Sequence, residues 1–203
     1  MHTWKAAKQR YPQVIYQIKS RRGLNDGQPC ASCTQGLVAH EEESLINTSE
    51  REHQEVLYLE DHVPGSVYEF GAIVMDEKAM IDFASQYDPQ AFHTDPVAAT
   101  KSSFGGLVAS GWHPVVLATR LLVDRYFSRL ANLGSPGIDE LRWLKPVRPG
   151  DELSVRLTIL EVRPSKSKTD RGAVKGLVEV LNQAGEVLTT WKGVNIVLRR
   201  NAG

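Results

Sequence analysis

The sequence predicts an α+β domain in which an antiparallel sheet wraps around a central helix. Two observations carry this prediction. The segment Val115–Val123 is apolar on nearly every face, which is typical of a buried helix. Several later segments alternate apolar with polar residues, the period of a strand that buries one face. A helix that is buried all round requires a sheet that curves about it.

The first elements of this domain follow one another between residues 53 and 96. A turn at Val63–Gly65 precedes a predicted strand over Ser66–Met75. Asp76 is a suitable cap for the next helix. One buried face of that helix is predicted at the spacing i, i+3, i+4, i+7, which comprises Met80, Phe83, Ala84 and Tyr87. Because Pro89 disfavours helical backbone at the residue before it, the helix should end at Asp88.

The central helix and the remaining strands fill the rest of the chain. We expect Ser110 to cap the helix, and Pro114 is tolerated in its first turn, where the missing N–H has no partner in any case. After the turn residues Gly134–Gly137, four strands are predicted, separated by Pro149–Asp151, a polar loop at Arg163–Arg171 and the hairpin Asn182–Gly185. These strands cover about Ile138–Leu144, Leu153–Ile159, Ala173–Leu181 and Val187–Leu198.

Residues 1–52 differ from the predicted domain at 53–203. Polar and charged side chains dominate the first stretch, so it buries too little apolar surface to offset the entropy lost on ordering. We predict a disordered or loosely ordered N-terminal extension. Cys30 and Cys33 form a lone C-x-x-C there, compatible with a redox pair or half of a zinc site. Since no second pair of metal ligands accompanies them, we interpret them as two thiols of a loop.

Charge and hydropathy exclude several classes of partner. Lys and Arg total 24 and Asp and Glu total 24, so no overall field attracts nucleic acid or an anionic membrane. No stretch approaches the roughly 18 apolar residues of a membrane span. The N-terminus lacks the apolar run of a secretory signal, so the expected location is the cytoplasm.

Asp88 and His93 are the candidate chemical groups. They lie five residues apart in a turn-prone segment, with the aromatic Phe92 between them. A carboxylate and an imidazole that share one water can divide the proton transfers needed to add water to a double bond. The alternative is structural: Asp88 caps a turn and His93 is a loop histidine with its hydrogen bonds satisfied. Asp95 admits two interpretations as well, a third acid/base group or the cap of a short helix from Pro96 to Thr100.

Three motifs in order resemble the MaoC-like dehydratases, the (R)-specific enoyl-CoA hydratase branch of the hot-dog superfamily. They are D-P-Q-A-F-H-T-D-P from residue 88, F-G-G-L-V-A-S-G-W-H from residue 104 and L-R-W-L-K-P-V-R-P-G-D-E-L from residue 141. The resemblance covers about residues 56–198 and implies a hot-dog fold. Gln90 and Ala91 depart from the commoner D-x-N-P-x-H pattern, and Ser110 replaces a frequent His.

The resemblance also implies a site and an activity. Asp88 and His93 would activate the water, and the thioester oxygen would meet a backbone N–H at Gly111, with Ser110 beside it. Phe92 and Trp112 are candidates for the acyl-binding surface, although an aromatic residue such as Trp112 at the head of a buried helix more often serves packing. The implied enzyme is a homodimer that hydrates an enoyl thioester, or dehydrates a 3-hydroxyacyl thioester, with coenzyme A or an acyl carrier as part of the substrate. It needs no metal or redox cofactor.

Two other functions remain open at the level of sequence. Relatives with this fold hydrolyse acyl-CoA with a carboxylate-activated water, so an acyl-CoA thioesterase is one alternative. A non-catalytic module that binds acyl thioesters is the other.

Overall fold

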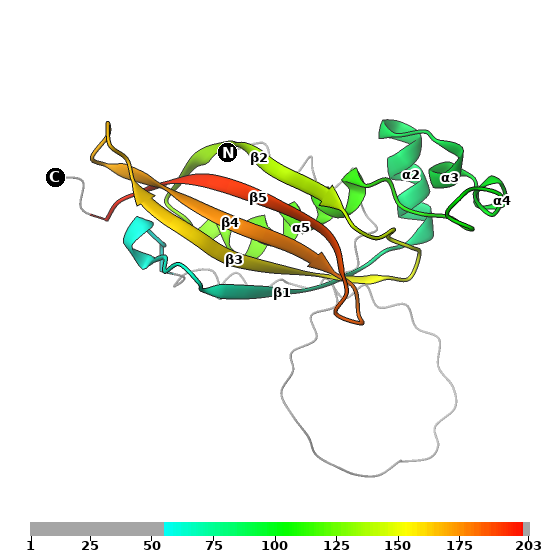
Figure 1. Ribbon diagram of the computed structural model, residues 1–203, viewed down its shortest axis with the longest axis horizontal. Helices are drawn as coiled ribbons and strands as arrows, with labels where there is room; N and C mark the ends of the chain where they lie inside the picture. Colours follow the sequence, from blue (N-terminus) through cyan, green and yellow to red (C-terminus); the bar gives the residue numbers. More distant parts are fainter. Residues whose placement is uncertain (1–54, 201–203) are drawn as a thin grey trace, which may run out of the picture.

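A five-stranded antiparallel sheet curves around one long helix in the computed structural model, which describes residues 55–200 (Figure 1). The strand order across the sheet is β1-β3-β4-β5-β2. The strands are β1 (Val67–Val74), β2 (Asn132–Trp143), β3 (Glu152–Pro164), β4 (Arg171–Leu181) and β5 (Val187–Leu198). The predicted sheet wrapped around a helix is therefore what the chain forms.

Short helices gather at one end of this sheet, next to the start of the long helix (Figure 1). The helices are α2 (Glu77–Tyr87), α3 (Ala91–Thr94), α4 (Pro96–Ala99) and α5 (Trp112–Arg125), with single turns η2 (Leu59–Asp61) and η3 (Phe127–Arg129). The Asp76 carboxylate accepts from the N–H of Ala79 and so caps α2 as predicted. Asp95 accepts from the N–H groups of Val97 and Ala98, which confirms its capping role at α4.

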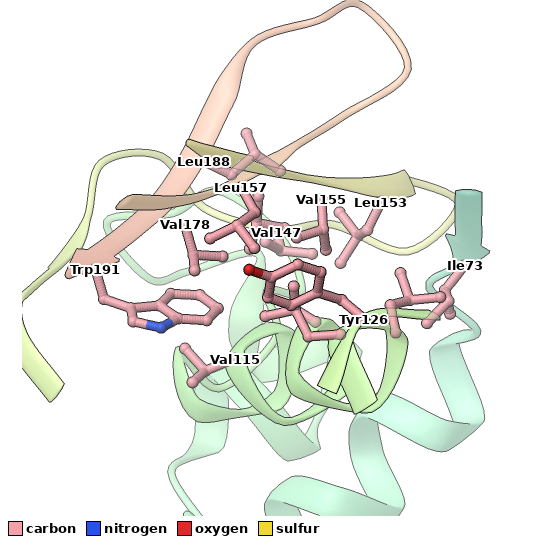
Figure 2. Close-up of a cluster of buried hydrophobic side chains, with 14 of the residues drawn as sticks. Ile73, Val115, Tyr126, Val147, Leu153, Val155, Leu157, Val178, Leu188 and Trp191 are labelled. Atoms are coloured by element: carbon pink, nitrogen blue, oxygen red, sulfur yellow. The ribbon is translucent and has the colours of Figure 1, made fainter. Parts of the chain in front are cut away.

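The core lies between α5 and the concave face of the sheet. On β3 the predicted alternation is confirmed, because the apolar residues from Leu153 to Ile159 are each at most 4% exposed. Val178 and Trp191 continue this layer on β4 and β5. Figure 2 shows their side chains on the side of the sheet that faces Val115 of α5 and Tyr126, the residue that follows α5. Each fully buried side chain of this size contributes about 1.5–3 kcal/mol, so the helix is held mainly by this face.

Three sequence predictions about these elements are wrong. Strand β2 begins at Asn132 and runs through Gly134–Gly137, where two of its three register shifts against β5 absorb the turn residues. Such irregularity is tolerated because β2 is an edge strand. Helix α5 is not covered on all sides: Val116 is 52% exposed, since the sheet packs against only part of its circumference. Tyr87, assigned to the buried face of α2, is 58% exposed.

The predictions for residues 1–52, including those for Cys30 and Cys33, lie outside the described residues. Within residues 55–200, no helix combines the length and the apolar character needed to cross a membrane.

Candidate active site

The structure brings Asp88 and His93 together at the end of α2. Asp88 directly follows the helix with φ −154° and ψ 66°, the non-helical backbone expected before Pro89. The one-turn helix α3 then places His93 so that its Nε2 lies 3.4 Å from Oδ2 of Asp88. A five-residue separation along the chain thus becomes a contact in space.

His93 is held in one orientation by the backbone. The ring is buried, with 6% of the residue exposed, and its Nδ1 lies 2.8 Å from the carbonyl oxygen of Val108. A carbonyl can only accept, so Nδ1 carries a proton and donates it to Val108. In the neutral imidazole, Nε2 therefore keeps its lone pair and directs it toward Asp88.

Two side chains donate hydrogen bonds to the Asp88 carboxylate. Gln90 Nε2 donates to Oδ1 and Ser110 Oγ donates to Oδ2, each at 2.7 Å. These bonds, that of Gln90 first and then that of Ser110, hold the pKa of Asp88 below its ordinary value, and the positive charge of His93, when its ring is protonated, adds to the effect. Asp88 is therefore ionised at neutral pH, although only 23% of its side chain is exposed.

Ser110 does not cap α5, contrary to the sequence prediction. Gly111 occupies the cap position and provides no side-chain hydrogen bond, while the Ser110 hydroxyl turns to Asp88. The N–H groups of Gly111 and Trp112 consequently find no backbone acceptor within residues 55–200. The start of α5 presents two free donors and the positive end of the helix dipole.

Asp88, His93 and Gly111 line one cavity of about 630 Å³. Phe92 and Trp112, the two aromatic residues predicted for the acyl-binding surface, line it as well. The Phe92 ring contacts His93 edge-on, with ring centroids 4.4 Å apart. The remaining wall combines apolar side chains with polar ones, and it includes Phe104, Val108, Trp143, Leu144, Val147, Gln90, Lys145 and Thr189. A cavity in which apolar side chains surround convergent polar groups suits a small-molecule ligand.

Sequence reasoning missed three contributors to this site. Gln90 was noted as a departure from a motif, and its position two residues after Asp88 is a usable signal for the hydrogen bond it donates. The Val108 carbonyl and the indole of Trp143, which donates to the carbonyl of Gly111 at 2.9 Å, have no local signature. Both arrive from distant parts of the chain.

Several known proteins are similar to this one in sequence and in fold. The MaoC-like dehydratase from Rhodospirillum rubrum is 40% identical, with a TM-score of 0.65 over 71% of this chain and 99% of that one. The (R)-hydratase PhaJ1 from Pseudomonas aeruginosa shares the fold at 24% identity, with a TM-score of 0.55 over 71% of this chain and 86% of that one. The uncharacterized protein YdeM of Bacillus subtilis is 26% identical over 62% of this chain and 87% of its own length.

These likenesses confirm the predicted hot-dog fold. The sequence profile described as "MaoC like domain" matches residues 60–181, more than half of the chain. The protein therefore belongs to the MaoC-like domain family.

Proposed function

We propose that this protein adds water to an enoyl thioester, or removes water from a 3-hydroxyacyl thioester. The observation that carries the proposal is the pairing of Asp88 Oδ2 and His93 Nε2 at 3.4 Å in the wall of the cavity at the start of α5. The Rhodospirillum rubrum relative, at 40% identity, bears the name of a dehydratase.

The two groups offer acceptors to a single water molecule. Asp88 is ionised, and with His93 in its neutral form Nε2 is an acceptor, because Nδ1 carries the proton donated to Val108. A water beside both atoms would donate one O–H to Asp88 Oδ2 and the other to His93 Nε2, and would keep an oxygen lone pair for attack. Ser110 and Gln90 contribute by fixing the carboxylate.

The proposed hydration balances without any further reactant. The water oxygen bonds to C3 of the enoyl group, one of its protons passes to the Asp88–His93 pair, and the pair returns a proton to C2. Dehydration is the same path reversed. The product is a 3-hydroxyacyl thioester, and the pair ends in its starting state of protonation.

Negative charge on the thioester oxygen develops as water adds, and the free N–H groups at Gly111 and Trp112 are suited to meet it. Backbone donors that are fixed before the reaction stabilise such charge without reorganisation. Phe92 and Trp112 would contact the acyl group, and the thioester carrier would be coenzyme A or an acyl carrier.

The proposed enzyme is a homodimer. Strand β2 is an edge strand with exposed Leu133 and Ile138, and the uncovered side of α5 exposes Val116 and Val123. Exposed apolar groups along a free strand edge are typical of an interface between subunits. Sedimentation equilibrium at micromolar concentration would refute the dimer by returning the mass of one chain.

The decisive experiment is hydration of enoyl-CoA substrates of graded length, followed by loss of the conjugated absorbance. Asp88→Asn and His93→Gln should each lower turnover by a factor on the order of 10² or more, because each removes proton transfer while preserving shape. Circular dichroism would check that both variants fold. Wild-type rates in either variant would remove that residue from the mechanism.

The same panel separates the two alternatives. A thioesterase would release free coenzyme A thiol, and His93→Ala would then be far milder than Asp88→Ala. A non-catalytic binding module would bind crotonyl-CoA without any loss of enoyl absorbance, and Asp88→Asn would leave that absorbance unchanged as well.

A further inference from the structure

Trp143 joins the sheet to the start of α5. It is the last residue of β2, where it pairs with Thr189 of β5, so the strand register fixes its backbone. Its indole Nε1–H donates to the carbonyl of Gly111 at 2.9 Å, across 32 residues of sequence. The side chain thus ties the end of one element to the first peptide group of another.

The indole ring also lies directly on the Cα of Gly111. A Cβ at that position would come within 2.5 Å of Nε1 and 2.6 Å of Cε2 of Trp143. The backbone conformation does not require glycine, because any residue can adopt the φ of −55° and ψ of −26° found at Gly111. Glycine is therefore required by the contact with the ring, and the ring approaches the backbone more closely than any side chain at 111 would permit.

The rest of the ring faces the cavity. Trp143 is 52% exposed and lines the cavity together with Asp88 and His93. It meets Trp112 edge-on, with ring centroids 5.5 Å apart. Two indoles therefore form a continuous aromatic wall beside the free N–H groups that open α5.

The hydrogen bond acts on the peptide between Gly111 and Trp112. A donor on its carbonyl restricts rotation of this peptide and polarises it, which makes the Trp112 N–H a stronger donor. Because the first peptides of a helix lack partners on their N–H side, such an anchor on the carbonyl side decides how they are oriented.

We propose that Trp143 is a positioning and specificity-determining residue of the hydratase site. Its N–H sets the orientation of the Gly111–Trp112 peptide that meets the thioester oxygen, and its ring limits the space available to the acyl group. The inference rests on the proposed hydratase function and names a residue that acts through the backbone and through the shape of the cavity.

Two substitutions separate the roles of the N–H and of the ring. Trp143→Phe keeps an aromatic wall and removes the donor, so kcat should fall on the order of five- to tenfold for every acyl length, with KM changed less than threefold. Trp143→Ala also opens the wall, so the ratio of kcat/KM for an eight-carbon over a four-carbon enoyl-CoA should rise about tenfold or more relative to wild type. Trp143→Leu serves the second purpose if the alanine variant does not fold.

The outcomes distinguish this inference from the function on which it rests. If wild-type protein hydrates no enoyl-CoA of the panel, the proposed function fails and the role of Trp143 fails with it. If wild type is active, two results overturn the inference alone: an unchanged kcat in Trp143→Phe, or an unchanged length preference in Trp143→Ala or Trp143→Leu. If Trp143 were purely structural, its replacement would lower the unfolding temperature and leave the preference for acyl length as it is in the wild type.

Discussion

A methyl group added at Gly111 measures the contact with Trp143 directly. In the wild-type background the new Cβ of Gly111→Ala would sit 2.5–2.9 Å from three ring atoms, so the indole must move and its hydrogen bond to the Gly111 carbonyl is lost. Overpacking of this kind costs about 1–3 kcal/mol. In a Trp143→Ala background the ring is absent, and alanine at a helical φ and ψ stabilises by about 0.4–1 kcal/mol. The two changes should therefore couple by about 1.4–4 kcal/mol, the difference between the effects of Gly111→Ala in the two backgrounds.

Urea unfolding of the wild type, the two single variants and the double variant gives this coupling energy. All four proteins should be compared at one protein concentration, because association between subunits would add to the apparent stability. If Gly111→Ala destabilises the Trp143→Ala protein as much as it destabilises the wild type, the glycine is required for a reason other than the indole. That result would refute the close packing of the Trp143 ring on the backbone of Gly111.

Two further predictions concern titration. Ser110→Ala and Gln90→Leu each remove a hydrogen bond that lowers the pKa of Asp88, so that pKa should rise and the acid limb of the kcat/KM profile should move to higher pH; a profile that coincides with the wild type would contradict the assignment. Burial against Phe83, with ring centroids 4.4 Å apart, lowers the pKa of His113 to about 4. The unfolded chain therefore binds a proton between pH 6.5 and 4 that the folded chain does not. Stability should fall with falling pH by up to about 1.4 kcal/mol per unit in this window, and His113→Phe should remove that part of the slope in urea titrations at pH 7, 6 and 5.

The local elements of this protein follow from neighbouring residues in the sequence. Strand β3 can be predicted because apolar residues alternate with polar ones from Leu153 to Ile159. The start of α2 can be predicted because Asp76 precedes a segment with helical periodicity. The proximity of Asp88 and His93 could be predicted for the same reason, because two residues five positions apart in a turn cannot lie far from each other. In each case the residues that determine the structure are close together in the sequence.

The contacts that complete the site were decided by the tertiary structure. Ser110 reaches Asp88 across 22 residues and Trp143 reaches Gly111 across 32, so the first contact depends on how the end of α2 lies against the start of α5 and the second on how β2 does, rather than on any local pattern. The same holds for the path of β2 through Gly134–Gly137, which pairing with β5 imposes on residues that favour a turn. Sequence periodicity determines which face of an element is apolar, whereas packing between elements determines which polar groups and backbone amides are left free for chemistry.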